Sequence, residues 1–148
     1  MKPFAIVFFL FCALGAGAQT ITVTGTSTIV LNALGDAHRV SLKVDDHTYS
    51  GVPLADLLTK AGAPLGPQLK GKQMTTYVLV RARDGYQVVF ALPELDSAFT
   101  DRVILLADQA DGQPLPTDKG PYRLVVPGEK KHARWIWGVT EIIVKKGD

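Results

Sequence analysis

Cysteine is almost absent from this 148-residue chain, which contains only Cys12. Cys12 lies inside an apolar run close to the N-terminus, so a chain that loses this run has no disulfide and no thiolate. This excludes a small fold stabilised by disulfides. An oxidising compartment would not change the covalent structure of such a chain, because it has no thiol to oxidise. The remaining chain of about 130 residues is long enough to bury a hydrophobic core without such cross-links.

A hydrophobic run long enough to cross a bilayer is also lacking. The apolar stretch from Phe4 to Leu14 follows Lys2 and precedes the small residues Ala16-Gly17-Ala18. This combination is typical of a secretory signal. We therefore expect residues 1–18 to be a signal peptide and residues 19–148 to form one domain, periplasmic or secreted, with no membrane insertion after cleavage. The alternative is a retained membrane anchor, which the short apolar run disfavours.

No single sign of charge dominates, because the formal net charge is +2. The distribution is uneven: residues 119–146 contain seven Lys or Arg and two Glu, a net charge of +5. Residues 19–118 contain eight Lys or Arg and eleven Asp or Glu, a net charge of −3. This asymmetry favours a local anionic ligand. Nucleic-acid binding is not expected, since such proteins carry more positive charge overall.

Recognisable catalytic constellations are missing as well. None of the histidines has a neighbour at the spacing of a triad or a metal site, and no serine lies in a nucleophile-elbow sequence. The run Asp45-Asp46-His47 offers oxygen and nitrogen atoms, but adjacent residues in a turn point in different directions. We expect a polar turn there, with no metal site, and we assign no catalytic residue. A hydrolase that uses Asp and His groups is an alternative that no spacing supports.

Strand patterns dominate what is present, so we expect an α+β fold with a mixed sheet and few short helices. We predict strands at residues 21–30, 38–44, 47–50, 75–82, 86–91, 103–107, 122–126 and 134–144. The clearest helix runs from Pro53 to Ala61 and ends at Gly62, and shorter helical turns are predicted at 31–36 and 93–99. Asp84-Gly85 predicts a tight hairpin turn.

The predicted core comes from the apolar positions of these elements. It consists of Leu54, Leu57, Leu58, Val78, Val80, Val88, Phe90, Ile104, Leu105, Leu106, Val125, Ile136 and Ile142. Trp135 and Trp137 are expected to point to one face and to cover the sheet or join the core.

The C-terminal segment combines turns with positive charge. Arg123 lies in an apolar strand that ends at Pro127-Gly128, and a basic loop leads to Arg134. If the turn folds the two strands onto each other, Arg123 and Arg134 approach from opposite strands and require solvent or an anion between them. Lys130, Lys131 and His132 would close the third side of this anion site. The alternative is a solvated hairpin loop with ordinary surface charge.

This segment, Gly-Pro-Tyr-Arg-Leu-Val-Val-Pro-Gly followed by a basic loop and Arg-Trp-Ile, resembles the end of the sulfite oxidase-type molybdopterin-binding domain. Three upstream blocks are similar to the family in the same order: the first begins at Tyr49, the second is Asp84-Gly85-Tyr86, and the third begins at Ile104. The resemblance covers about residues 40–144. It implies an oxidoreductase fold with a molybdopterin cofactor and a membrane redox partner.

The resemblance also implies roles for individual residues. Arg123 and Arg134 stand where basic residues approach the pterin and its phosphate, and Lys130, Lys131 and His132 fill the loop between them. Tyr86 of the matching Asp-Gly-Tyr turn either packs on the sheet or lines the ligand. The family binds molybdenum through a cysteine before the first block, whereas residues 43–48 here contain none. Two alternatives therefore remain open: an exported domain that binds a pterin cofactor or a related anion with a redox role, and a cofactor-free binding or accessory module.

Overall fold

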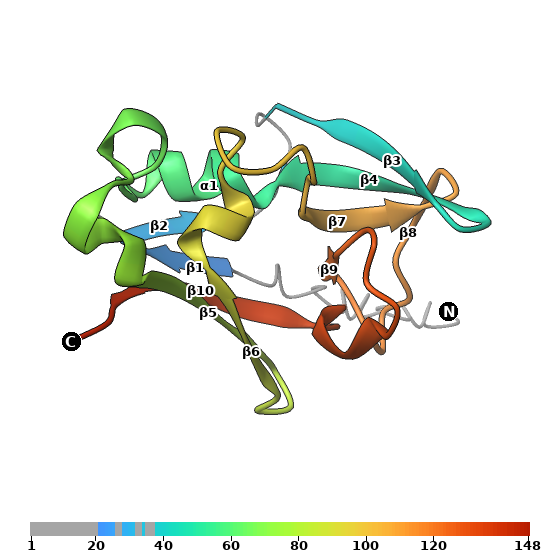
Figure 1. Cartoon of the computed structure of the whole chain (residues 1–148). Helices are drawn as coiled ribbons and strands as arrows, with labels where there is room; N and C mark the ends of the chain where they lie inside the picture. Colours follow the sequence, from blue (N-terminus) through green and yellow to red (C-terminus); the bar gives the residue numbers. More distant parts are fainter. Residues whose placement is uncertain (1–20, 26–27, 32–33, 35–37) are drawn as a thin grey trace, which may run out of the picture.

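The computed structural model describes residues 21–25, 28–31, 34 and 38–148, which form two β-sheets and one α-helix (Figure 1). The strands are β1 Ile21–Thr24, β2 Thr28–Leu31, β3 Val40–Val44, β4 His47–Pro53, β5 Thr76–Ala82, β6 Gln87–Ala91, β7 Leu105–Ala110, β8 Gln113–Pro114, β9 Arg123–Val125 and β10 Val139–Lys146. The helix is α1 Leu54–Lys60, and short 3₁₀ helices span Gly66–Gln68, Gly71–Thr75, Leu92–Leu95 and His132–Arg134. The expected α+β class is confirmed.

The first sheet has the strand order β2-β1-β10-β5-β6. β1 pairs with β10 in parallel, whereas the other neighbours in this sheet are antiparallel, so the sheet is mixed. The N-terminal strand thus lies beside the C-terminal strand at the centre of the sheet. The tight hairpin predicted at Asp84-Gly85 joins β5 to β6 and is confirmed.

The second sheet has the order β3-β4-β7-β8, and β9 pairs with β7. The turn between β3 and β4 is Asp45-Asp46, with Asp45 in the left-handed region at a φ of 54°. Gly51 in β4 lies so close to β7 that an added Cβ would meet the Leu106 carbonyl oxygen at 2.0 Å. Only glycine therefore permits this pairing.

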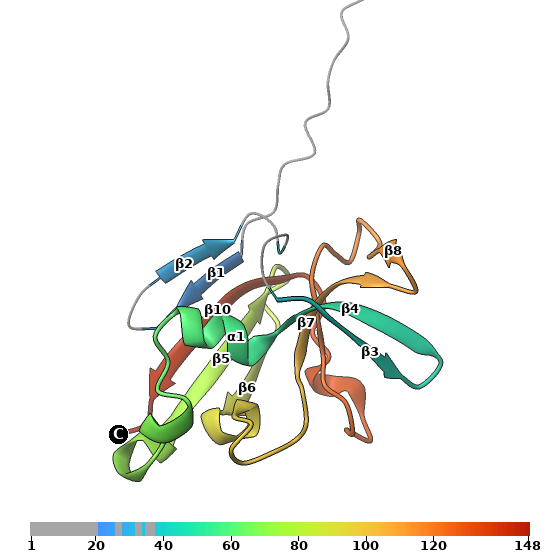
Figure 2. The same ribbon diagram turned by 90° about the horizontal axis from the view of Figure 1, so that it is seen from above.

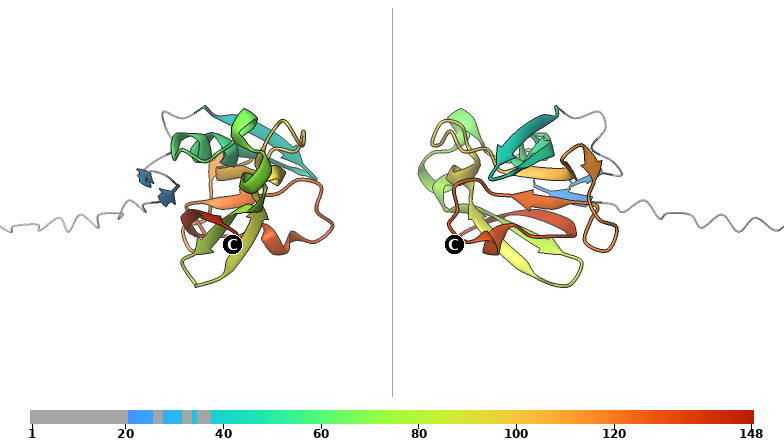
Figure 3. Two further views of the ribbon diagram at one scale, coloured as in Figure 1. Left: turned by 60° about the vertical axis from the view of Figure 1, so that its left-hand side comes forward. Right: turned by 90° about the vertical axis from the view of Figure 1, so that its right-hand side faces the viewer.

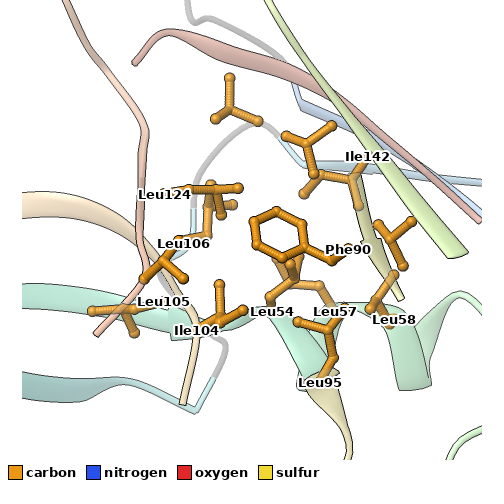
Figure 4. Close-up of a cluster of buried hydrophobic side chains, with 14 of the residues drawn as sticks. Leu54, Leu57, Leu58, Phe90, Leu95, Ile104, Leu105, Leu106, Leu124 and Ile142 are labelled. Carbon is orange, nitrogen blue, oxygen red and sulfur yellow. The ribbon is translucent and has the colours of Figure 1, made fainter. Parts of the chain in front are cut away.

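α1 covers one face of the first sheet, and the hydrophobic core lies between α1 and the two sheets (Figures 2 and 3). Leu54, Leu57 and Leu58 point from α1 toward Phe90 and Ile142 of the first sheet, as Figure 4 shows. All thirteen predicted core residues are buried, which confirms that prediction. Among the described residues, no helix has the length and apolar character needed to span a bilayer.

Three predicted elements need correction. The expected single strand at residues 21–30 is an antiparallel hairpin of β1 and β2, because the alternating pattern continues across the reversal and does not mark it. Gly25 lies so close to Ala61 that an added Cβ would meet the Ala61 carbonyl oxygen at 2.5 Å. The helix expected at 93–99 is a 3₁₀ turn, since the Asp96 carboxylate accepts the Ala98 N–H and competes with helical bonding. The strand expected from residue 134 begins only at Val139.

Two further predictions fall outside what the structure describes. The signal peptide at residues 1–18 lies outside the described residues. The helical turn at 31–36 also lies mostly outside them, although its first residue, Leu31, belongs to β2.

Candidate functional site

The C-terminal segment does fold back on itself, but in a register that separates the two predicted arginines. The Leu124 N–H donates to the Ile136 carbonyl at 2.9 Å, and Arg123 forms an isolated antiparallel bridge with Trp137. Arg134 lies three residues earlier, in the 3₁₀ helix His132–Arg134. The prediction that Arg123 and Arg134 face each other from opposite strands is therefore wrong.

Arg123 is held among aromatic rings. The centre of its guanidinium lies 4.0 Å from the ring centroid of Trp137, 5.1 Å from that of Trp135 and 5.5 Å from that of Tyr49. Its Nη1 donates to the Tyr49 hydroxyl at 3.1 Å, whereas its buried Nε has no acceptor. Burial lowers the pKa of Arg123, although Tyr49 acts in the opposite direction. No carboxylate pairs with this cation in the described part of the chain.

Arg134 has the opposite environment, because two carboxylates engage it. Its Nε donates to Glu129 at 2.7 Å, its Nη2 contacts Glu129 and donates to Glu94 at 3.1 Å, and its Nη1 donates to the Val89 carbonyl. Burial tends to lower the pKa of Arg134, but the bonds to Glu94 and Glu129 outweigh it and raise the pKa. The positive charge of Arg134 is thus neutralised within the protein.

Glu94 binds two cations at once. The Arg102 guanidinium donates to its Oε1 at 3.1 Å, as Arg134 does, and the Ala91 N–H donates to Oε2 at 2.8 Å. Burial acts to raise the pKa of Glu94, but the hydrogen bonds from Arg134 and the Ala91 N–H, together with the charges of both arginines, lower it overall. Glu94 is therefore ionised wherever the fold is intact near neutral pH.

The remaining predicted site residues lie along the basic loop. Lys130 and Lys131 are exposed, and neither forms an ion pair among the described residues. His132 stacks on Trp135, with ring centroids 4.0 Å apart, and its Nε2 lies 3.9 Å from a carboxylate oxygen of Asp45. Tyr86 is 50% exposed and donates from its hydroxyl to the Ala133 carbonyl at 2.9 Å, so it fastens the loop to the β5–β6 hairpin.

Sequence reasoning missed the residues that define the two arginine environments. Tyr49 is 74 positions from Arg123, and Glu94 is 40 positions from Arg134, so no local pattern joins them. Glu129 was within reach of a sequence argument, because it lies in the same loop as Arg134 at a separation of five residues.

We next ask whether the possible metal ligands and the cations of this segment fit a molybdenum-bearing pterin cofactor. The β3–β4 turn, where the family places its cysteine, holds Asp45 and Asp46, and the neighbouring His47 bonds to Asp111 at 2.7 Å. No three His, Cys, Asp or Glu side chains converge in a metal-binding group among the described residues. Molybdenum prefers a soft thiolate, which this region lacks. With Arg134 neutralised as well, the residues present do not fit that cofactor.

Comparison with known proteins identifies similar structures and the family of the chain. A structural match is the sulfane dehydrogenase SoxCD from Paracoccus pantotrophus, with a TM-score of 0.66 and 18% sequence identity over 87% of this chain and 38% of that chain. This likeness shows the fold, and the chain spans well under half of that protein. The comparison with curated proteins found no match. The family model described as the oxidoreductase molybdopterin binding domain matches residues 18–147, so the chain belongs to this family.

Proposed function

We propose that this protein is an exported binding module that keeps the molybdopterin-binding fold and works without molybdenum. The observation that supports this most strongly is the pairing of Arg134 with Glu129 and Glu94. A cation that already contacts two carboxylates attracts a further anion weakly, because the ligand must displace or face those negative charges. The missing thiolate points the same way. Fold and chemistry separate readily in evolution.

Within this module, Arg123 is the residue best suited to contact a small anion. It is a half-buried guanidinium that bonds to a neutral hydroxyl, and it has no carboxylate partner among the described residues. An arginine carries five N–H donors; in Arg123 the Nε donor is buried and one Nη1 donor is bonded to Tyr49, so a ligand would be met by the remaining Nη donors. Charge-assisted hydrogen bonds from a partly desolvated arginine are stronger than those made in water. The aromatic rings around it keep the guanidinium in place.

The first test is chemical analysis of protein exported from a molybdenum-replete host. We expect neither stoichiometric molybdenum or tungsten nor extractable pterin. Stoichiometric amounts of either would overturn the cofactor-free proposal. That outcome would instead support a redox role with a pterin cofactor and a membrane partner, which membership of the family favours.

The second test distinguishes the roles of Arg123 and Arg134 and uses thermal unfolding in phosphate or sulfate at low ionic strength. Wild type should be stabilised by mass action. Arg123→Gln should lose that stabilisation, whereas Arg134→Gln should keep it. Arg81→Gln is a matched control, because Arg81 is also a strand arginine but pairs with Glu141. Absence of any anion-dependent stabilisation in wild type would show that Arg123 is not an anion site.

A further inference from the structure

A cleft of about 750 Å³ lies away from the predicted anion site. One wall is α1 with Asp56 and Thr59, the second is the loop Gly62–Gln68, and the third is the segment Leu95–Ile104 before β7. Its volume falls within the range of about 300–1,000 Å³ common for small-molecule sites. None of the residues named for cofactor binding lines it, so it is a separate feature of the fold.

Hydrogen bonds fasten the three walls to one another. The Asp96 carboxylate accepts the Gly66 N–H at 2.6 Å and the Ala98 N–H at 2.8 Å, which ties the second wall to the third. The Leu54 N–H donates to the Ile104 carbonyl at 2.8 Å and ties the start of α1 to the end of the third wall. The cleft is therefore held open by the folded structure, and a ligand would not have to order it.

The charge in this cleft is negative. Asp96 is only 4% exposed, and no lysine, arginine or histidine pairs with it among the described residues. Buried carboxylates are usually paired with a cation. Asp101 on the rim likewise has no ion pair in this part of the chain, and Asp56 contacts only His38, at 3.1 Å. Arg102 also lines the cleft but binds Glu94.

Apolar groups complete the lining. Leu65, Leu95 and Ile104 supply apolar surface, and Val103 is 38% exposed at the edge. A site of this kind suits a ligand with a positively charged group and a short apolar chain, because the charge can lie beside the aspartates and the chain can pack on the apolar lining. We infer that this cleft binds a small organic cation, such as an alkylamine, with its ammonium group near Asp96, Asp56 and Asp101. Such a ligand supplies the counter-charge that the buried Asp96 lacks.

The test uses titration calorimetry and amide NMR on the full processed chain at low salt. Butylamine and putrescine should bind and shift the amide signals of Gly66 and Ser97, whereas n-butanol, of similar size without the charge, should bind more weakly. Asp56→Asn with Asp101→Asn should weaken amine binding roughly tenfold or more, as expected when charge-assisted bonds are lost. Asp118→Asn is the matched control, because Asp118 is exposed and lies outside the cleft.

Three results would overturn the inference: no amine binding by wild type, equal binding of n-butanol, or equal weakening by the Asp118 control. Wild-type binding and its comparison with n-butanol need no variant, so a folding defect in the double variant cannot hide the answer. Neither aspartate contacts Arg123 or Arg134. Failure here therefore leaves the anion and molybdenum experiments unaffected, and the reverse also holds.

Discussion

Replacing Glu94 by Gln tests whether the Glu94 carboxylate helps to neutralise the positive charge of Arg134. Glu94 lies just after β6 and joins Arg134 of the C-terminal loop to Arg102 before β7. Glutamine keeps the shape and one acceptor oxygen but removes the negative charge. The variant therefore leaves Arg102 with a neutral partner and leaves Arg134 with Glu129 as its remaining carboxylate, and the penalty for that change should appear directly in the free energy of unfolding.

The expected size of this effect follows from burial. The side chain of Glu94 is 31% exposed and that of each arginine partner 28% exposed. Exposed ion pairs contribute about 0–1 kcal/mol, and breaking buried pairs costs about 3–5 kcal/mol. An intermediate loss of about 1–3 kcal/mol is expected at neutral pH. For a domain of this size that corresponds to about 3–5 °C in Tm for each kcal/mol.

The pH dependence of this stability difference provides an independent test. The pKa of Glu94 in the folded protein is lowered, so its stabilising contribution is complete above the pKa of the unfolded chain. The contribution is lost as the pH falls through the folded-state pKa. The difference in stability between wild type and Glu94→Gln should therefore be constant from about pH 7 to pH 5 and shrink below about pH 4.

Urea unfolding followed by circular dichroism measures both quantities. A double-mutant cycle with Arg134→Met isolates the Glu94–Arg134 coupling, expected at about 0.5–3 kcal/mol. Glu141→Gln is the control, because Glu141 pairs with Arg81 at 3.1 Å but is 41% exposed, and its loss should be about 0–1 kcal/mol. Equal losses for the two glutamates, or a cycle energy near zero, would refute the claim that Glu94 takes part in neutralising Arg134 and would leave Glu129 as its only effective partner among the described residues.

Three other changes have definite expected outcomes. Leu57→Ala should lower the free energy of unfolding by about 2–5 kcal/mol in urea titrations, because Leu57 is 1% exposed in the core; an unchanged Tm would show that α1 does not pack as described. Gly51→Ala should abolish soluble, cooperatively folding protein, since its Cβ would collide with the Leu106 carbonyl; normal yield and Tm would contradict the close approach of β4 and β7. N-terminal sequencing of exported protein should begin at Gln19 or Thr20, and an intact Met1 would disprove signal cleavage.

Much of the fold was predictable because its signals are local. Period-two patterns with an Asp-Gly turn identify β5 and β6, and helical spacing of leucines after Pro53 identifies α1. Burial follows from the same patterns, because an apolar face has to be covered wherever its element packs. The errors in the predicted elements also came from local patterns. Alternation continued across Gly25, so one strand was predicted where the chain reverses.

Sequence alone determined the residue types and the elements that carry them: an arginine in an apolar strand, a basic loop, and no thiolate near the first family block. Only the tertiary structure decided what each charge meets. A shift of three positions in the pairing places Trp137, and not Arg134, opposite Arg123. Glu94 reaches Arg134 across forty residues, and Asp96 lines a cleft built from three separate segments. Electrostatic energy depends on distance in space and on burial, and neither is set by separation along the chain.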